Sequence, residues 1–109
     1  MGALLFRMHP EDFQAVTRFG RPAGSSLSDW PFRYDELRPH YDAIEALIGL
    51  SGGPGNPCEP PRAAYPLGPL PTHPVAAALD AAARAVGAPA YTAPRGLVPK
   101  GHTRPRPAC

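Results

Sequence analysis

The chain carries four histidines and two cysteines, the side chains that most often bind metals or act as nucleophiles. They are His9, His40, Cys58, His73, His102 and Cys109. No two histidines have the i, i+4 spacing that places a ligand pair on one helix face, and no H-E-x-x-H segment occurs. Cys58 lies in Asn-Pro-Cys-Glu-Pro, without the pattern of base and orienting group that a nucleophile needs. We therefore predict no catalytic residue and no metal site in this chain by itself.

Two of the histidines have a simpler interpretation, because His9 and His73 each directly precede a proline. Proline suits the first position of a helix, where its missing N–H is not needed. Both histidines are therefore expected at helix N-termini. The first helix should begin at His9–Pro10 and end at Gly20, where a glycine interrupts the apolar pattern.

The strongest helical pattern lies before Gly49, which we predict as its C-terminal cap. One stripe of the helix would carry Leu37, Tyr41, Ile44 and Ile48. Pro39 lacks an N–H and its ring clashes with the preceding turn. We therefore expect residues 34–37 to form a separate short turn and Pro39 to open the main helix.

A third helix is predicted from Pro74 to Gly87, again with apolar residues at helical spacing. That stripe would carry Val75, Leu79, Ala82 and Val86. Between the second and third helices, residues 51–71 are too rich in Gly and Pro for a regular helix or a central strand. A short strand is expected at 90–92, and coil from Pro94 onward.

The composition agrees with a mostly α fold that has extensive coil: three amphipathic helices, a Pro/Gly-rich connector and one short strand. Gly and Pro number 11 and 17 of 109 residues, about a quarter, which is typical of loop-rich sequence. The net charge of +2 is too small to indicate a nucleic-acid partner. No apolar run approaches the roughly 18 residues of a membrane span, and no secretory signal is visible.

The most specific feature is the block Asp29-Trp30-Pro31 followed by Tyr34-x-x-Leu37-x-Pro39-x-Tyr41. It resembles the corresponding segment of glucose–methanol–choline (GMC) oxidoreductases, in the branch similar to gluconate 2-dehydrogenase. The stretches at 6–13, 41–52, 65–74 and 106–109 also resemble that family, in the same order. The resemblance therefore covers nearly the whole chain and is strongest over residues 6–50.

The resemblance implies an internal fragment of an α+β, two-domain, FAD-dependent dehydrogenase that oxidises the hydroxyl of a sugar, a sugar acid or another alcohol. Residues 1–109 would form one partial segment. Residues 1–50 would be the end of the flavin loop and a helical excursion, 51–72 a connector, and 73–109 a helix and the entry to the substrate domain. The dinucleotide fingerprint G-x-G-x-x-G is absent, so the chain alone is expected to be inactive and not to hold FAD.

The resemblance also implies site residues and partners. Arg7 would lie near the flavin, and Cys109 would be an iron–sulfur ligand only in a full-length parent. The remaining FAD and substrate domains would be the partners, together with electron-transfer subunits as candidates, without nucleic acid or direct membrane insertion. The compartment stays unknown, with a periplasmic or membrane-associated parent as one option.

The alternative from another class is a small standalone, Pro-rich helical interaction protein. Its candidate features are the Pro66-x-x-Pro69 and Pro71-x-x-Pro74 spacings, which a PxxP-binding groove could recognise. A complete reading frame and a cooperative melt of the lone monomer would favour it over the fragment interpretation.

Overall fold

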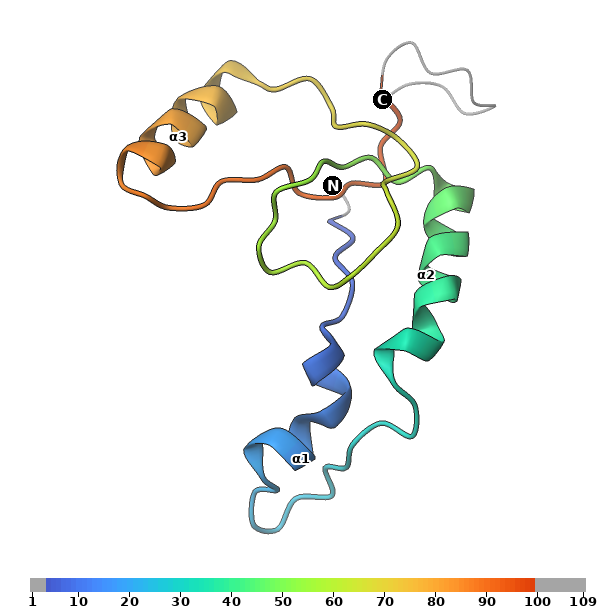
Figure 1. Cartoon of the computed structure of the whole chain (residues 1–109). Coiled ribbons are helices and arrows are strands. Elements are labelled where there is room, and N and C mark those ends of the chain that lie inside the picture. The colour runs from blue at the N-terminus through green and yellow to red at the C-terminus, as the bar shows by residue number, and fades with distance from the viewer. Residues whose placement is uncertain (1–3, 100–109) are drawn as a thin grey trace.

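The computed structural model describes residues 4–99 (Figure 1). Its helices are η1 (Pro10–Gln14, a 3-10 helix), α1 (Ala15–Phe19), α2 (Tyr34–Ile48) and α3 (Pro74–Ala85). The rest of the described chain is coil, apart from isolated β-bridges. The predicted class, mostly α with extensive coil, is confirmed.

The first helical unit begins and ends where the sequence predicts, although its first turn is 3-10. The carboxylate of Asp12 accepts a hydrogen bond from the His9 N–H at 2.6 Å, so the start is capped from inside the helix. Gly20 ends the unit with φ 81°, and its N–H donates to the carbonyl of Val16 at 2.9 Å. A positive φ of this kind favours glycine over every other residue.

The prediction that residues 34–37 form a separate turn and that Pro39 opens the main helix was wrong. The helix is continuous from Tyr34 to Ile48, and Pro39 lies inside it. The carbonyl of Asp35, four residues earlier, loses its N–H donor, but both residues are exposed, so water can take the donor's place. Gly49 ends the helix in the left-handed conformation, at φ 69°, as predicted.

Helix α3 has the predicted ends but lies apart from the other helices. The His73 ring accepts a hydrogen bond from the Val75 N–H at 3.2 Å, and Gly87 follows the helix at φ 72°. Within the described chain, α3 packs against none of the other helices. Val75, Leu79 and Val86 are therefore 61%, 66% and 79% exposed.

The expected strand at 90–92 is absent, and this prediction was wrong. Pairing occurs instead at three isolated bridges: Leu4 with Arg95, Ser51 with Leu67, and Ser51 with Arg95. Residues 90–93 have no hydrogen-bonding neighbour within 4–99, and a strand needs a partner to form a ladder.

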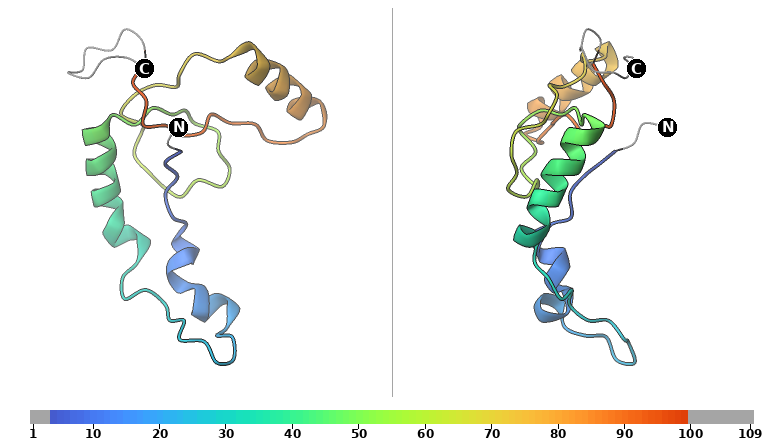
Figure 2. Two further views of the ribbon diagram at one scale, coloured as in Figure 1. Left: turned by 180° about the vertical axis from the view of Figure 1, so that it is seen from behind. Right: turned by 90° about the vertical axis from the view of Figure 1, so that its right-hand side faces the viewer.

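The buried core is small for a chain of this length. It consists of Phe13, Tyr34, Leu50, Leu67 and Val98. The radius of gyration is 17.2 Å, against about 13 Å for a compact domain of about 100 residues. Figure 2 shows the open, flat shape, with extents of 51 × 40 × 24 Å. No helix in the described part is long and apolar enough to cross a membrane.

Candidate functional site

The buried face of α2 is centred on a charged residue. Glu45 is only 5% exposed, whereas Ile44, which the apolar stripe predicted as buried, is 53% exposed. Tyr34 is buried on the same side, and Tyr41 and Ile48 are half-buried. The helix therefore turns a carboxylate toward the N-terminal segment, and that carboxylate needs a partner.

Arg7 is that partner, and the two side chains form a bidentate pair. Arg7 Nε and Nη2 donate to the two Glu45 carboxylate oxygens, each at 2.7 Å. Nη2 also donates to Asp42 at 2.5 Å, and Nη1 to the Tyr34 hydroxyl at 3.2 Å. The fork geometry of arginine suits such a paired contact, which joins the N-terminal segment to α2 across 38 positions of sequence.

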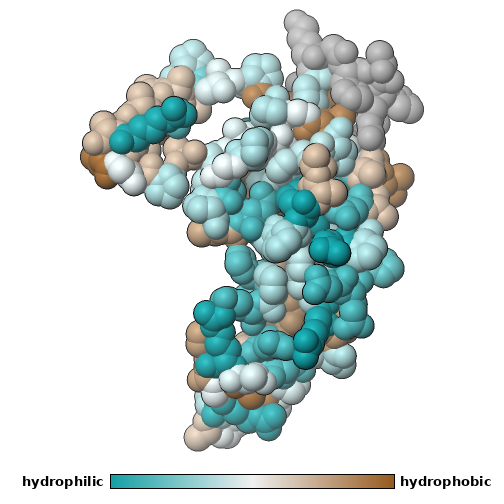
Figure 3. Space-filling model, in the orientation of Figure 1, coloured by the Kyte–Doolittle hydropathy of each residue, from teal (hydrophilic) through white to brown (hydrophobic). Residues whose placement is uncertain are grey.

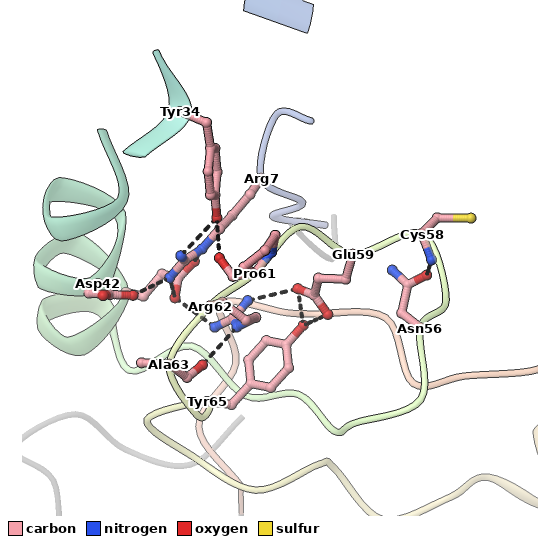
Figure 4. Close-up of polar contacts among 11 residues, drawn as sticks. Arg7, Tyr34, Asp42, Asn56, Cys58, Glu59, Pro61, Arg62, Ala63 and Tyr65 are labelled. Carbon is pink, nitrogen blue, oxygen red and sulfur yellow. Dashed lines mark hydrogen bonds and ion pairs between the residues drawn. The ribbon is translucent and has the colours of Figure 1, made fainter. Parts of the chain in front are cut away.

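A second arginine from the connector shares the same carboxylate (Figure 4). Arg62 Nη2 donates to Glu45 Oε2 at 2.6 Å, and Nη1 donates to Glu59 at 2.8 Å. The Tyr65 hydroxyl donates to both Glu59 oxygens, at 2.5 and 2.7 Å, while its ring lies 3.5 Å below the Arg62 guanidinium carbon. We name Arg7, Tyr34, Asp42, Glu45, Glu59, Arg62 and Tyr65 the ion-pair network.

The electrostatics of the ion-pair network follow from its burial and its hydrogen bonds. Burial on its own lowers the pKa of the Arg7 guanidinium, but the hydrogen bonds to Glu45, Asp42 and Tyr34 outweigh it and raise that pKa above its usual value. Burial, followed by the hydrogen bond to Glu59, raises the pKa of the Tyr65 phenol. The arginine stays charged and the phenol neutral, so the network is built to hold structure rather than to transfer protons near neutral pH.

A glycine lets the connector approach the ion-pair network. A Cβ placed on Gly52 would lie 2.5 Å from Cε1 of Tyr65, closer than any real contact. The Gly52 N–H donates to the Leu67 carbonyl at 3.2 Å. This hydrogen bond holds the two segments of the connector together, so they cannot easily move apart to make room for a side chain at Gly52. This position therefore requires glycine for close approach rather than for a special φ.

The Asp-Trp-Pro block has a structural role that the sequence did not reveal. Asp29 accepts hydrogen bonds from the N–H groups of Val16 and Thr17, at 2.7 and 3.2 Å, and also from the Thr17 hydroxyl. Asp29 thus caps α1 from a distance, and the Thr17 hydroxyl, then the backbone N–H groups, lower its pKa. Trp30 packs edge-on against Phe13, with ring centroids 6.3 Å apart, and stays half exposed.

One histidine, His9, lies against the backbone of one cysteine, Cys58. His9 Nε2 lies 2.5 Å from the backbone carbonyl oxygen of Cys58, so the contact does not involve the thiol. Cys58 is exposed and free, and no cluster of His, Cys, Asp and Glu that could hold a metal occurs among residues 4–99. Cys109 and His102 lie outside the described residues.

The described residues do not form a cradle for a dinucleotide. Helices α2 and α3 begin after Arg33 and His73, without a glycine-rich turn whose N–H groups could face a pyrophosphate. The Arg7 side chain is 1% exposed, and most of its N–H groups already bond to protein. A flavin contact by Arg7 or its neighbouring backbone stays a prediction, and no chemical step is derived through FAD.

Comparison with known proteins gives one partial similarity. A stretch of 56 residues is 41% identical to a 2-methyl-1,2-propanediol dehydrogenase of Mycolicibacterium austroafricanum. The stretch is 51% of this chain but only 10% of that dehydrogenase. No protein-family model matches the chain. About half of the chain is thus similar to part of an oxidoreductase.

Proposed function

We propose that this chain is a structural segment of an FAD-dependent, GMC-type dehydrogenase that oxidises the hydroxyl of a sugar, a sugar acid or another alcohol. The observation that carries the proposal is the 41% identity over 56 residues to a dehydrogenase whose substrate is a diol. The division of the chain into segments 1–50, 51–72 and 73–109 belongs to the same proposal.

In the parent enzyme this segment would hold other parts in place rather than react. Its buried charged side chains, Arg7 and Glu45, belong to the ion-pair network, and every buried side-chain nitrogen or oxygen in the described part has a partner. FAD would carry out the hydride transfer, and its binding glycines and the catalytic base would come from the remainder of the polypeptide. The partners would be that remainder and, as candidates, electron-transfer subunits.

The open shape supports the proposal over a standalone interaction protein. Large apolar side chains are exposed along the described chain rather than gathered in one core. Among them are Phe6, Phe19, Trp30, Leu47, Leu79 and Val86. A standalone domain of about 100 residues is expected to have a radius of gyration of about 13 Å, whereas this chain has 17.2 Å.

The experiment is to express the complete reading frame that contains these residues, with the 109-residue chain as the matched control. We expect the longer protein to retain FAD and the flavin absorbance to bleach when gluconate or 2-methyl-1,2-propanediol is added without an acceptor. The control chain should do neither. A longer protein without flavin, or turnover by the 109-residue chain with added FAD, would contradict the proposal.

A further inference from the structure

A cavity of about 850 Å³ lies between α3 and the coil that follows it, residues 89–93 and Arg95. Figure 3 shows the opening between α3 and the body of the molecule. The volume falls in the range of about 300–1,000 Å³ that small-molecule sites occupy. Such sites combine apolar walls with a few polar groups that orient the ligand. The groups that line the cavity therefore indicate which ligand chemistry suits it.

The apolar part of the lining comes from α3 and from the coil segments. Helix α3 contributes Ala76, Leu79 and Ala83, and the coil contributes Pro54 and Pro89. Leu79 is 66% exposed, so a ligand with an apolar skeleton would cover surface that is open to solvent. Removing such surface from water is favourable.

The charged part of the lining consists of Asp80, Arg84 and Arg95. Asp80 is already paired, because Arg84 Nε and Nη2 lie 3.2 and 2.7 Å from its two carboxylate oxygens. The Arg95 guanidinium has no hydrogen-bond or ion-pair partner within residues 4–99. Asp80 is also the only acidic residue in 61–109. The lining therefore carries one positive charge that is not compensated.

The uncharged polar groups of the lining add hydrogen-bond donors. His73 Nδ1 accepts the Val75 N–H at 3.2 Å, so Nε2 carries the hydrogen when the ring is neutral. Tyr91 and Thr92 contribute hydroxyl groups. Because a guanidinium has donors and no acceptor, Arg95 and His73 both suit a ligand that accepts hydrogen bonds.

We propose that this cavity binds a small organic carboxylate that has an apolar skeleton. The Arg95 guanidinium would donate to both carboxylate oxygens, the paired contact that the arginine fork favours. The skeleton would lie against Leu79 and the alanines of α3. A monoanion matches the single uncompensated charge, whereas a dianion would leave one negative charge unpaired. The inference does not depend on the proposed function, because it concerns only residues of this chain.

NMR titration of the 109-residue chain tests the inference. The probe is naphthoate, and the corresponding naphthamide is its neutral match of similar shape. Naphthoate should shift the amide signals of Ala76, Leu79, Ala83 and Thr92 until they saturate. It should bind about tenfold more tightly than naphthamide, since a charged hydrogen-bonded pair contributes roughly that factor. Equal affinities, no saturable shifts, or shifts spread along α2 overturn the inference.

Two arginine variants show whether the preference arises in the cavity. Arg95→Gln should remove the preference for naphthoate over naphthamide. The backbone pairing of Arg95 with Ser51 does not use the side chain, so the substitution keeps that contact. Arg38→Gln is the matched control, because it removes one partly exposed guanidinium from α2 and changes the net charge equally. A preference that survives Arg95→Gln, or that Arg38→Gln removes to the same extent, overturns the inference.

Discussion

Glu45 is the residue on which the described structure most depends. Its carboxylate is 5% exposed and neutralises part of the charge of two buried arginines that come from different segments. A buried ion pair adds little stability over an apolar pair, but removing one partner leaves charge without compensation. Glu45 therefore matters mainly because its removal would leave Arg7 and Arg62 without that compensating charge.

Glu45→Gln should lower the free energy of unfolding by about 3–5 kcal/mol, the usual cost of breaking a buried pair. Urea titration followed by circular dichroism measures this. Glu11→Gln is the matched control, because Glu11 pairs with Arg18 at the surface and both are about half exposed. That control should change stability by less than about 1 kcal/mol. Equal effects of the two substitutions would show that the network is not buried in solution.

Titration of the Tyr65 phenol should make the folded chain less stable at alkaline pH. Burial, then the hydrogen bond to Glu59, raises the pKa of the folded phenol above its unfolded value of about 10. The phenol therefore contributes stability that is complete below pH 10 and is lost as pH rises toward the folded pKa. Thermal melts at pH 8 and pH 11 should show a larger loss for the natural chain than for Tyr65→Phe. Parallel losses would contradict the role assigned to the phenol.

At the scale of elements, the helix ends follow from local chemistry. Gly20, Gly49 and Gly87 end or follow their helices with positive φ, and His73 caps α3 with its own ring. These features depend on residues within one turn of each other, so the sequence alone predicts them.

The buried faces could not be predicted in the same way. Hydrophobic periodicity counts Glu45 as polar and Ile44 as apolar. It therefore predicted a buried face of α2 that includes Ile44, whereas the face that is buried includes Glu45. The partners of Glu45 lie 38 and 17 positions away, and no local pattern in one sequence links them. Asp29 as a remote cap of α1 was missed for the same reason.

Pro39 is the weak point of α2, because it removes one hydrogen bond from the helix interior. Pro39→Ala should restore the bond to the Asp35 carbonyl and stabilise the chain by up to about 3 kcal/mol. Pro74→Ala is the matched control, since Pro74 occupies the first turn of α3, where no N–H is needed. Urea midpoints of the two variants provide the comparison. A gain no larger for Pro39→Ala than for Pro74→Ala would mean that the proline fits α2 without cost.

At the scale of the whole molecule, the described chain is an open arrangement of helices and coil rather than a packed globule. Its sequence already indicated a loop-rich chain through its Gly and Pro content. The sequence could not show that polar contacts at one place join the separate segments of this open structure. The N-terminal segment, α2 and the connector all meet at the ion-pair network.

The bridges of Ser51 and Arg95 have a consequence for cleavage of the chain. The turn around Gly55 is exposed, while Glu45, Arg62, Leu67 and Arg95 tie together segments on either side of it. A protease cut after Gly55 should therefore yield two peptides that still elute together in gel filtration without denaturant and separate only in urea. Peptides that part at once in native buffer would contradict this. The gene could accordingly be split at this turn, and its halves would reassemble without a covalent link.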